Sequence, residues 1–147
     1  LYIIRELINF QADSAKTDVG MALKYLTNVI KKRCTTFMIS DFIDIQDYNN
    51  ALTIANRKHD IVALQVYDSL ETQLPSVGLM KVMDAESGTE RWVDTSSRRV
   101  RQVYQDWWKK QQENMQTSFN RSKVDNVSVR TDEDYVKALM ALFKKRS

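Results

Sequence analysis

Two short apolar segments, separated by a helical pattern, place the strongest constraint on how this chain can fold. The first is TTFMIS, residues 35–40, and the second is IVALQVY, residues 61–67. Both are nearly continuous in apolar residues, which is typical of strands that helices cover on both faces. Between them, Tyr48, Leu52 and Ala55 recur at helical spacing. The order strand, helix, strand predicts an α/β fold with a doubly wound, mainly parallel sheet, because parallel neighbours need a crossover connection.

Four further segments carry apolar residues at a spacing of three or four, as helices with one buried face do. Thr17 is expected to cap the second of these helices, and Ser96 or Ser97 is expected to cap the third. Thr131 and Asp134 resemble a capping box at the start of the last helix. The residues predicted to be buried are Ile4, Leu7 and Ile8; Val19, Leu23, Leu26 and Ile30; Val100, Val103, Tyr104, Trp107, Met115 and Phe119; and Val136, Leu139, Met140 and Phe143.

The middle of the chain departs from this alternation. Two short strand-like runs, residues 79–82 and 91–94, are joined by DAESGTE, in which Gly88 is able to adopt positive φ. They predict a small β-hairpin insertion, with a further short strand at residues 127–129. Because no linker rich in Gly, Pro or Ser divides the chain, we expect residues 1–147 to form a single domain.

Composition excludes several classes of protein. The chain has 147 residues, of which 43% are hydrophobic, enough for a real core. Its 22 Lys and Arg are spread among 19 Asp and Glu, which favours a solvated surface over a nucleic-acid interface. Cys34 is the only cysteine, so a reducing compartment is expected. No apolar run approaches the ~20 residues that cross a bilayer, and we expect a cytoplasmic protein, peripheral to a membrane at most.

Three carboxylates at a spacing of three, Asp41, Asp44 and Asp47, follow the first predicted strand. Asp41 comes directly after the strand, and ligands of open parallel sheets bind beyond the carboxyl ends of the strands. It is therefore the best single functional candidate, either in recognition or as the key residue of a metal-dependent hydrolase or phosphoryl-transfer enzyme. For Asp44 and Asp47 we favour the simpler role of complementing a helix N-terminus.

Other polar and aromatic candidates point to structure or contact rather than chemistry. His59 has no second His or Cys nearby, which argues against a zinc site. Trp107 and Trp108 lie about 100° apart on a helix, so only one can face the core. Helical phase with Val100 and Val103 predicts that Trp107 is buried and that Trp108 is exposed as a contact surface.

Several segments together resemble a known family. They are Thr17 opening a helix, ISDF at residues 39–42, RKHDIVALQVYD, LPSVGLMKVMDAESGTERWVDTSS and the closing DYVKALMALFKKR. This combination resembles the C-terminal half of the von Willebrand factor A-like proteins of unknown function that lie beside MoxR-type AAA+ ATPases in bacteria. The chain begins with Leu1 inside a helical pattern, which we interpret in the same way, as a piece of a longer protein.

The resemblance implies an A-domain fold with a metal-ion-dependent adhesion site that holds Mg²⁺. In the family this site uses an Asp-x-Ser-x-Ser loop, a threonine and an aspartate, and the last two correspond to Thr17 and Asp41. The Asp-x-Ser-x-Ser loop has no counterpart in these residues, and the usual glycine after the aspartate is Phe42. We therefore expect an incomplete site and weak or no Mg²⁺ binding by this chain alone.

The expected function is that of a protein-interaction module without catalysis. The resemblance implies a MoxR-type AAA+ ATPase or its client as the partner, in the maturation or assembly of other proteins. Asp44 and Trp108 are the expected partner contacts. The central strand of an A-type sheet would lie upstream of Leu1, so we expect the missing N-terminal half, or another copy of the chain, to lie against the strand at residues 35–39.

Overall fold

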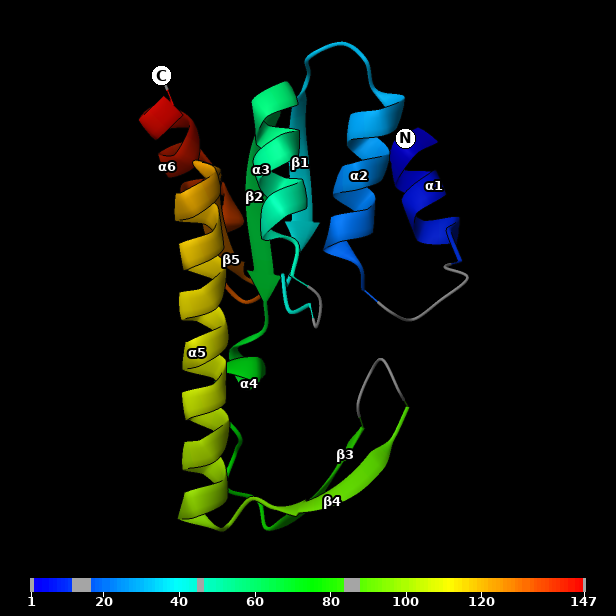
Figure 1. The fold of residues 1–147 in the computed structure, drawn as a ribbon. Coiled ribbons are helices and arrows are strands. Elements are labelled where there is room, and N and C mark those ends of the chain that lie inside the picture. The colour runs from blue at the N-terminus through cyan, green and yellow to red at the C-terminus, as the bar shows by residue number, and fades with distance from the viewer. Residues whose placement is uncertain (1, 12–16, 45–46, 84–87, 147) are drawn as a thin grey trace.

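The computed structural model describes residues 2–11, 17–44, 47–83 and 88–146. Figure 1 shows a mixed α/β arrangement in which one helix is much longer than the others. The helices are α1 (Tyr2–Asn9), α2 (Val19–Val29), α3 (Asn49–Lys58), α4 (Ser69–Thr72), α5 (Arg98–Ser122) and α6 (Tyr135–Arg146). The strands are β1 (Thr35–Ser40), β2 (Asp60–Tyr67), β3 (Leu79–Met83), β4 (Glu90–Asp94) and β5 (Asp125–Arg130). Within the described residues, no helix is both long enough and apolar enough to cross a membrane.

The main sheet is parallel, as predicted, and has the strand order β1-β2-β5. Helices α2, α3 and α5 pack on one face of β2, where Leu52, Ile61 and Phe119 belong to one buried core. Helix α6 lies on the other face, where its Phe143 contacts Phe37 of β1 edge to face at 6.2 Å. The central strand β2 is therefore covered on both sides.

The first strand is covered less than its sequence predicts. Along β1 burial alternates, so that Thr35, Phe37 and Ile39 are exposed and the residues between them are half-buried. Among the described residues β1 pairs only with β2, which leaves its other edge without a neighbouring strand. The prediction of two covered faces is thus confirmed for β2 and wrong for β1.

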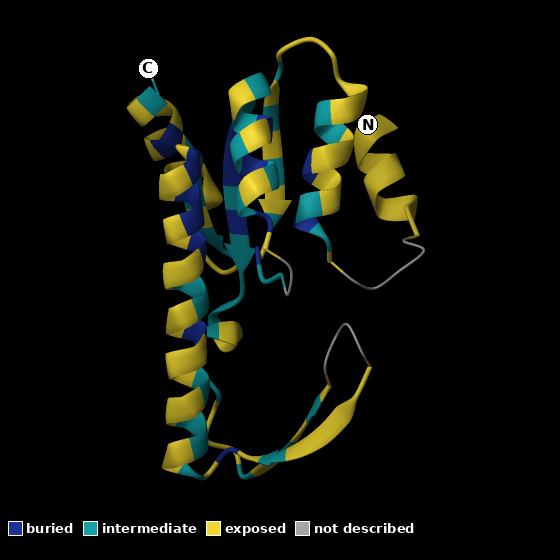
Figure 2. Cartoon of the chain, viewed as in Figure 1, coloured by how far each residue is buried: buried dark blue, intermediate teal, exposed yellow. Residues whose placement is uncertain are grey.

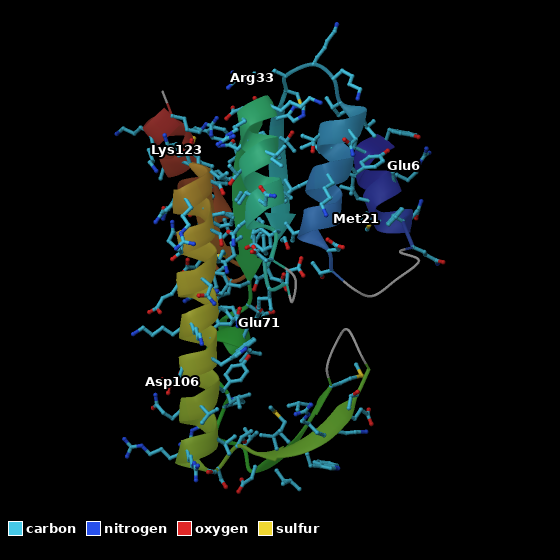
Figure 3. All side chains as sticks on the ribbon, in the orientation of Figure 1. Glu6, Met21, Arg33, Glu71, Asp106 and Lys123 are labelled. Atoms are coloured by element: carbon cyan, nitrogen blue, oxygen red, sulfur yellow. The ribbon has the colours of Figure 1, made fainter. Side chains whose placement is uncertain are left out.

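The first two helices differ in how well their apolar faces are buried. In α1 the residues predicted to be buried are exposed, with Ile8 at 77%, so that prediction is wrong (Figure 2). In α2, Val19 and Leu23 are buried, whereas Ile30 is exposed and Met21 projects outward (Figure 3). Both helices lie beside the uncovered edge of the sheet, where the described residues offer little apolar surface to pack against.

Two of the predicted caps are also wrong. Asp18, not Thr17, caps α2, because its carboxylate accepts a hydrogen bond from Met21 N at 2.6 Å. At α6 the carboxylate of Asp134 accepts from Val136 N, but the Thr131 hydroxyl donates instead to Asp68. Charged carboxylates are stronger acceptors than hydroxyls, which explains why the aspartates hold the cap positions.

The buried faces of the last two long helices differ from those predicted. In α5, Met115 and Phe119 are buried as predicted, but Trp108 is only 9% exposed and Trp107 is 41% exposed. Trp108 lies against Tyr67 at 5.9 Å, at the carboxyl end of β2. The N-terminal half of α5, which carries Val100 and Val103, runs past the end of the sheet (Figure 1). The helix face that these two valines share therefore does not indicate which tryptophan is buried.

Helix α6 also buries a different face from the one predicted. Leu142 is its buried residue, whereas Val136, Met140 and Phe143 are exposed. Arg146, one turn after Leu142, pairs with Asp60 at 2.5 Å and with Asp125 at 2.7 Å, at the amino ends of β2 and β5. Leu142 and Arg146 therefore share the face of α6 that lies toward the sheet.

The predicted hairpin is confirmed as the antiparallel pair β3-β4, although residues 84–87 of its connection lie outside the described residues. It projects from the N-terminal end of α5, away from the main sheet (Figure 1). Its base is held by Thr95, which is fully buried and whose backbone N and hydroxyl both donate to Gly78 O. Gly78 has φ of 85°, a conformation that favours glycine.

Candidate functional site at the carboxyl edge of the sheet

The chain turns sharply after β1, at the position predicted for the functional aspartate. Asp41 is exposed, and its Oδ1 accepts hydrogen bonds from Ile43 N at 3.2 Å and from the Ser40 hydroxyl at 3.3 Å. The Ser40 hydroxyl in turn accepts from Phe42 N at 3.0 Å. This turn fixes the direction of the Asp41 carboxylate while leaving it accessible from solvent.

Phe42 has an unusual backbone for a bulky residue. Its φ is 57°, in the left-handed region, which costs roughly 1–2 kcal/mol for residues other than glycine. Its side chain is only 5% exposed and meets Phe119 edge to face, with ring centroids 5.0 Å apart. Burial of the ring offsets the backbone cost, and the turn keeps a conformation that glycine would adopt without strain.

Asp44 and Asp47 bind the N-terminal ends of helices, as predicted. Asp44 Oδ2 accepts from Val19 N of α2 at 2.9 Å. Asp47 Oδ1 accepts from the backbone N of Asn49 at 2.9 Å and from its Nδ2 at 2.6 Å, at the start of α3. The contact between Asp44 and Val19 joins the segment after β1 to the start of α2.

The structure places Thr17 at the same edge of the sheet. Thr17 is exposed and lines a shallow cavity of about 280 Å³ together with Val19, Met38 and Ser40. Ser40 is the neighbour of Asp41, so the two residues that the resemblance selects lie around one end of β1 and α2. Among the described residues, no group of three or more His, Cys, Asp or Glu side chains is arranged to hold a metal ion.

A buried polar network beneath this turn was not predicted. Gln65 is almost fully buried, and its Nε2 donates to Gln112 Oε1 at 3.0 Å and, over 3.5 Å, to Asp41 O. Its Oε1 accepts from the Ser128 hydroxyl at 2.7 Å. Gln65 therefore joins β2, β5, α5 and the turn after β1. Its signal in the sequence is a glutamine inside an otherwise apolar strand.

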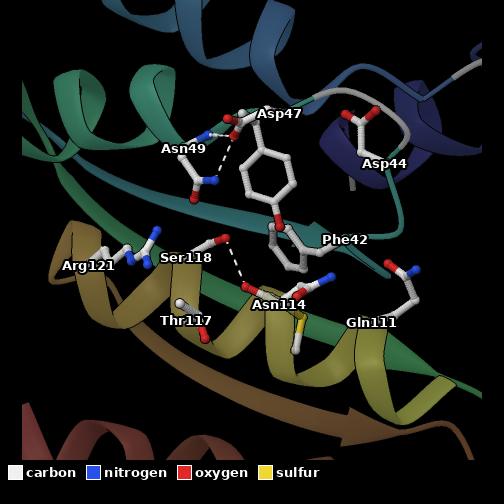
Figure 4. Close-up of a pocket in the computed structure, with 11 residues that line it drawn as sticks. Phe42, Asp44, Asp47, Asn49, Gln111, Asn114, Thr117, Ser118 and Arg121 are labelled. Carbon is white, nitrogen blue, oxygen red and sulfur yellow. Dashed lines mark hydrogen bonds between the residues drawn. The ribbon is translucent and has the colours of Figure 1, made fainter. Parts of the chain in front are cut away.

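A second, polar cavity of about 390 Å³ lies between the start of α3 and the C-terminal half of α5 (Figure 4). Asp44, Asp47 and Tyr48 line it on the α3 side. Burial, together with the nearby carboxylates of Asp44, Asp47 and Asp41, raises the pKa of Tyr48 to about 12. The phenol therefore keeps its proton at any physiological pH, and the cavity wall around it is negative.

The remaining candidates have structural positions. Trp108 is buried, so the prediction that it forms an exposed partner contact is wrong. The more exposed ring is that of Trp107, which lies tilted against Tyr104 with ring centroids 5.5 Å apart. His59 is fully buried, with its Nδ1 3.4 Å from the Cys34 sulfur. A single Cys and a single His are too few for a zinc site, as the sequence indicated.

Comparison with known proteins gives relatives without a described function. An uncharacterised protein of Mycobacterium tuberculosis (strain H37Rv) is 31% identical over 74 residues, which are 50% of this chain and 23% of that protein. An uncharacterised protein of Mycobacterium avium is 22% identical over 129 residues, which are 88% of this chain and 76% of that protein. The chain thus matches less than a quarter of the length of the M. tuberculosis relative.

No solved structure matches the chain. The sequence pattern of one family, described as "Protein of unknown function DUF58", matches residues 1–114. That match covers most of the chain, and we conclude that the chain belongs to the DUF58 family.

Proposed function

We propose that this chain is the C-terminal part of a von Willebrand factor A-like protein-interaction domain, and that it binds its partner at the carboxyl edge of the parallel sheet. The observation that carries the proposal is the turn after β1, where exposed Asp41 precedes Phe42 with its left-handed backbone. The resemblance has an aspartate and a glycine at these positions. A left-handed backbone is what glycine would provide there, so the turn has the shape that the resemblance requires.

The metal that the resemblance implies is only partly supported by the donor set. Thr17 and Asp41 offer a hydroxyl and a carboxylate, which are the oxygen ligands that Mg²⁺ prefers. An octahedral Mg²⁺ ion has six ligands and takes several of them from water, so two protein donors would hold it only weakly. Tight Mg²⁺ binding at this edge therefore needs further ligands, from other parts of the protein or from the partner.

The partner that we propose is a MoxR-type AAA+ ATPase or its client, in a cytoplasmic or membrane-peripheral setting. Recognition rather than catalysis is supported by the exposure of Asp41 on an open edge of the sheet, where a partner can reach its carboxylate. Asp44 belongs to this surface through its contact with the start of α2.

We further propose that the free edge of β1 is covered in the working protein, by the N-terminal half that the resemblance implies or by another copy. Ile39 is 69% exposed and Phe37 is also exposed, beside an edge with no strand paired to it in the described residues. Helix α1 adds a further exposed apolar face. An open strand edge flanked by apolar surface favours pairing with another segment.

The test is calorimetric titration with the MoxR-type ATPase encoded by the same organism, with Mg²⁺ and then with EDTA. We expect Mg²⁺-dependent binding that Asp41→Ala weakens and that Asp106→Ala, an exposed carboxylate on α5, leaves unchanged. Equal affinity in Mg²⁺ and EDTA contradicts the adhesion site. Turnover of phosphate esters that Asp41→Ala abolishes would replace the proposal with an enzyme.

A further inference from the structure

One face of α5 is polar where it passes the start of α3. Gln111, Asn114, Thr117 and Arg121 follow one another at spacings of three, three and four, so they share one face of the helix. A helix that packs on a sheet usually turns an apolar stripe toward it, and α5 does so with Phe119 on the adjoining face. The polar face instead lines the cavity shown in Figure 4, which we call the α5 cavity.

One polar atom in the wall of the α5 cavity has no hydrogen-bond partner within the described part of the chain. The Oδ1 atom of Asn49 is buried and receives no hydrogen bond. Tyr48, which also lines the cavity, is more than nine-tenths buried, with 8% exposure. An unpaired buried polar group destabilises a fold, so the side-chain carbonyl oxygen of Asn49 points to a ligand that completes it.

The charges of the cavity are separated along its length. In Figure 4, Asp44 and Gln111 lie at one end, Asp47 and Asn49 lie between, and Arg121 lies at the other end. The carboxylates of Asp44 and Asp47 favour a cation near them, and the guanidinium of Arg121 favours a carboxylate. A matching ligand therefore carries a positive group and a negative group some distance apart.

We propose that the α5 cavity binds an extended peptide segment of a partner protein, with a Lys or Arg side chain toward Asp44 and Asp47 and an Asp or Glu side chain toward Arg121. From Gln111 to Arg121 the helix rises about 15 Å, at 1.5 Å per residue. An extended chain spans that length in about five residues. The carboxamides of Asn49, Asn114 and Gln111 offer both donors and acceptors, which is what the peptide groups of such a segment require.

This inference rests on the proposed function only in taking the partner to be a protein. The contacts it uses are hydrogen bonds and ion pairs of α5, of Asn49 and of the preceding carboxylates Asp44 and Asp47, and none of them requires Mg²⁺. The two ideas can therefore fail separately, since one is tested in EDTA and the other depends on Asp41.

The probe is a fluorescein-labelled heptapeptide, Ser-Lys-Ser-Ala-Ser-Glu-Ser, titrated with the 147-residue chain in EDTA and followed by fluorescence anisotropy. Its Lys and Glu are four residues apart, so both point to the same side of an extended chain. We expect it to bind at least about tenfold more tightly than the same peptide with Gln at both positions, because two charge-assisted contacts are lost in the neutral peptide.

A charge exchange makes the assignment specific. Arg121→Glu is expected to weaken the Lys and Glu peptide about tenfold and to favour a peptide with Lys at both positions. Arg99→Glu is the matched control, because it makes the same charge change on an exposed residue of α5, about 33 Å away along the helix. Thermal unfolding followed by circular dichroism confirms that both variants fold, and Arg121→Gln supplies a milder variant.

Equal binding of the charged and neutral peptides overturns the inference, and so does an equal loss in Arg99→Glu and Arg121→Glu. Peptide binding in EDTA together with an ATPase that does not bind supports the α5 cavity and contradicts the adhesion site. The converse result, Mg²⁺-dependent ATPase binding without peptide binding, contradicts the α5 cavity alone.

Discussion

Replacement of Phe42 tests the geometry of the turn that carries Asp41. Phe42 is 5% exposed and contacts Phe119 edge to face at 5.0 Å, so truncation to alanine removes a buried ring. Such truncations cost about 3–5 kcal/mol of unfolding free energy. Alanine also keeps the left-handed strain of this position, where φ is 57°.

Glycine is expected to be the less harmful substitution. At an ordinary position glycine is less stable than alanine by about 0.5–1 kcal/mol, because it has more freedom to lose on folding. In the left-handed region glycine avoids a strain of roughly 1–2 kcal/mol that alanine keeps. We therefore expect Phe42→Gly to cost about 2–4 kcal/mol and to be more stable than Phe42→Ala by about 0.5–1 kcal/mol.

Urea unfolding of the three proteins, followed by tryptophan fluorescence, gives these differences if the slopes with denaturant are equal. An alanine variant as stable as the glycine variant, or more stable, would refute the left-handed turn. If replacing Phe42 left the free energy of unfolding unchanged, the packing of Phe42 on Phe119 would be refuted.

Three further predictions concern stability and assembly. The hydrogen bond from Arg146 holds the pKa of Asp60 below its usual range. The contribution of this pair to the free energy of unfolding is therefore present above pH 4 and is lost as the pH falls through the lowered pKa. The melting temperature should therefore fall more steeply below pH 4 in the unmodified chain than in Asp60→Asn, by an amount equivalent to about 1 kcal/mol or less because the pair is partly exposed. Trp108→Ala should cost about 3–5 kcal/mol in urea unfolding and Trp107→Ala less than half of that, and equal costs would contradict the burial of Trp108. Analytical ultracentrifugation of the chain alone should detect self-association through residues 35–39, whereas a sharply melting monomer at every concentration would contradict the proposed cover of that edge.

The sequence predicted the elements better than their orientation. The continuous apolar runs at residues 35–40 and 61–67 were sufficient to predict two parallel strands and the helix between them. Orientation failed in α6, whose sequence places apolar residues on several faces, so periodicity alone could not select Leu142. The observed face also carries the ion pairs of Arg146 with Asp60 and Asp125, which link residues far apart in the sequence and leave no periodic signal.

The candidate site was predictable where it depends on position in the chain. Asp41 was selected because it follows a strand, and the structure places it at the carboxyl edge. The α5 cavity was not predictable, because it joins Asn49 to residues such as Asn114 and Arg121 more than sixty positions away. In the sequence these polar residues on a long helix have the pattern of an ordinary solvated face.

The measurement that tests the proposed binding surface most directly is amide hydrogen exchange of the chain with and without the MoxR-type ATPase. Binding is expected to protect residues 40–44 and 17–22, which form the carboxyl edge around Asp41 and the start of α2. Protection confined to the hairpin of β3 and β4, with residues 40–44 exchanging as in the free chain, would contradict the proposed binding surface.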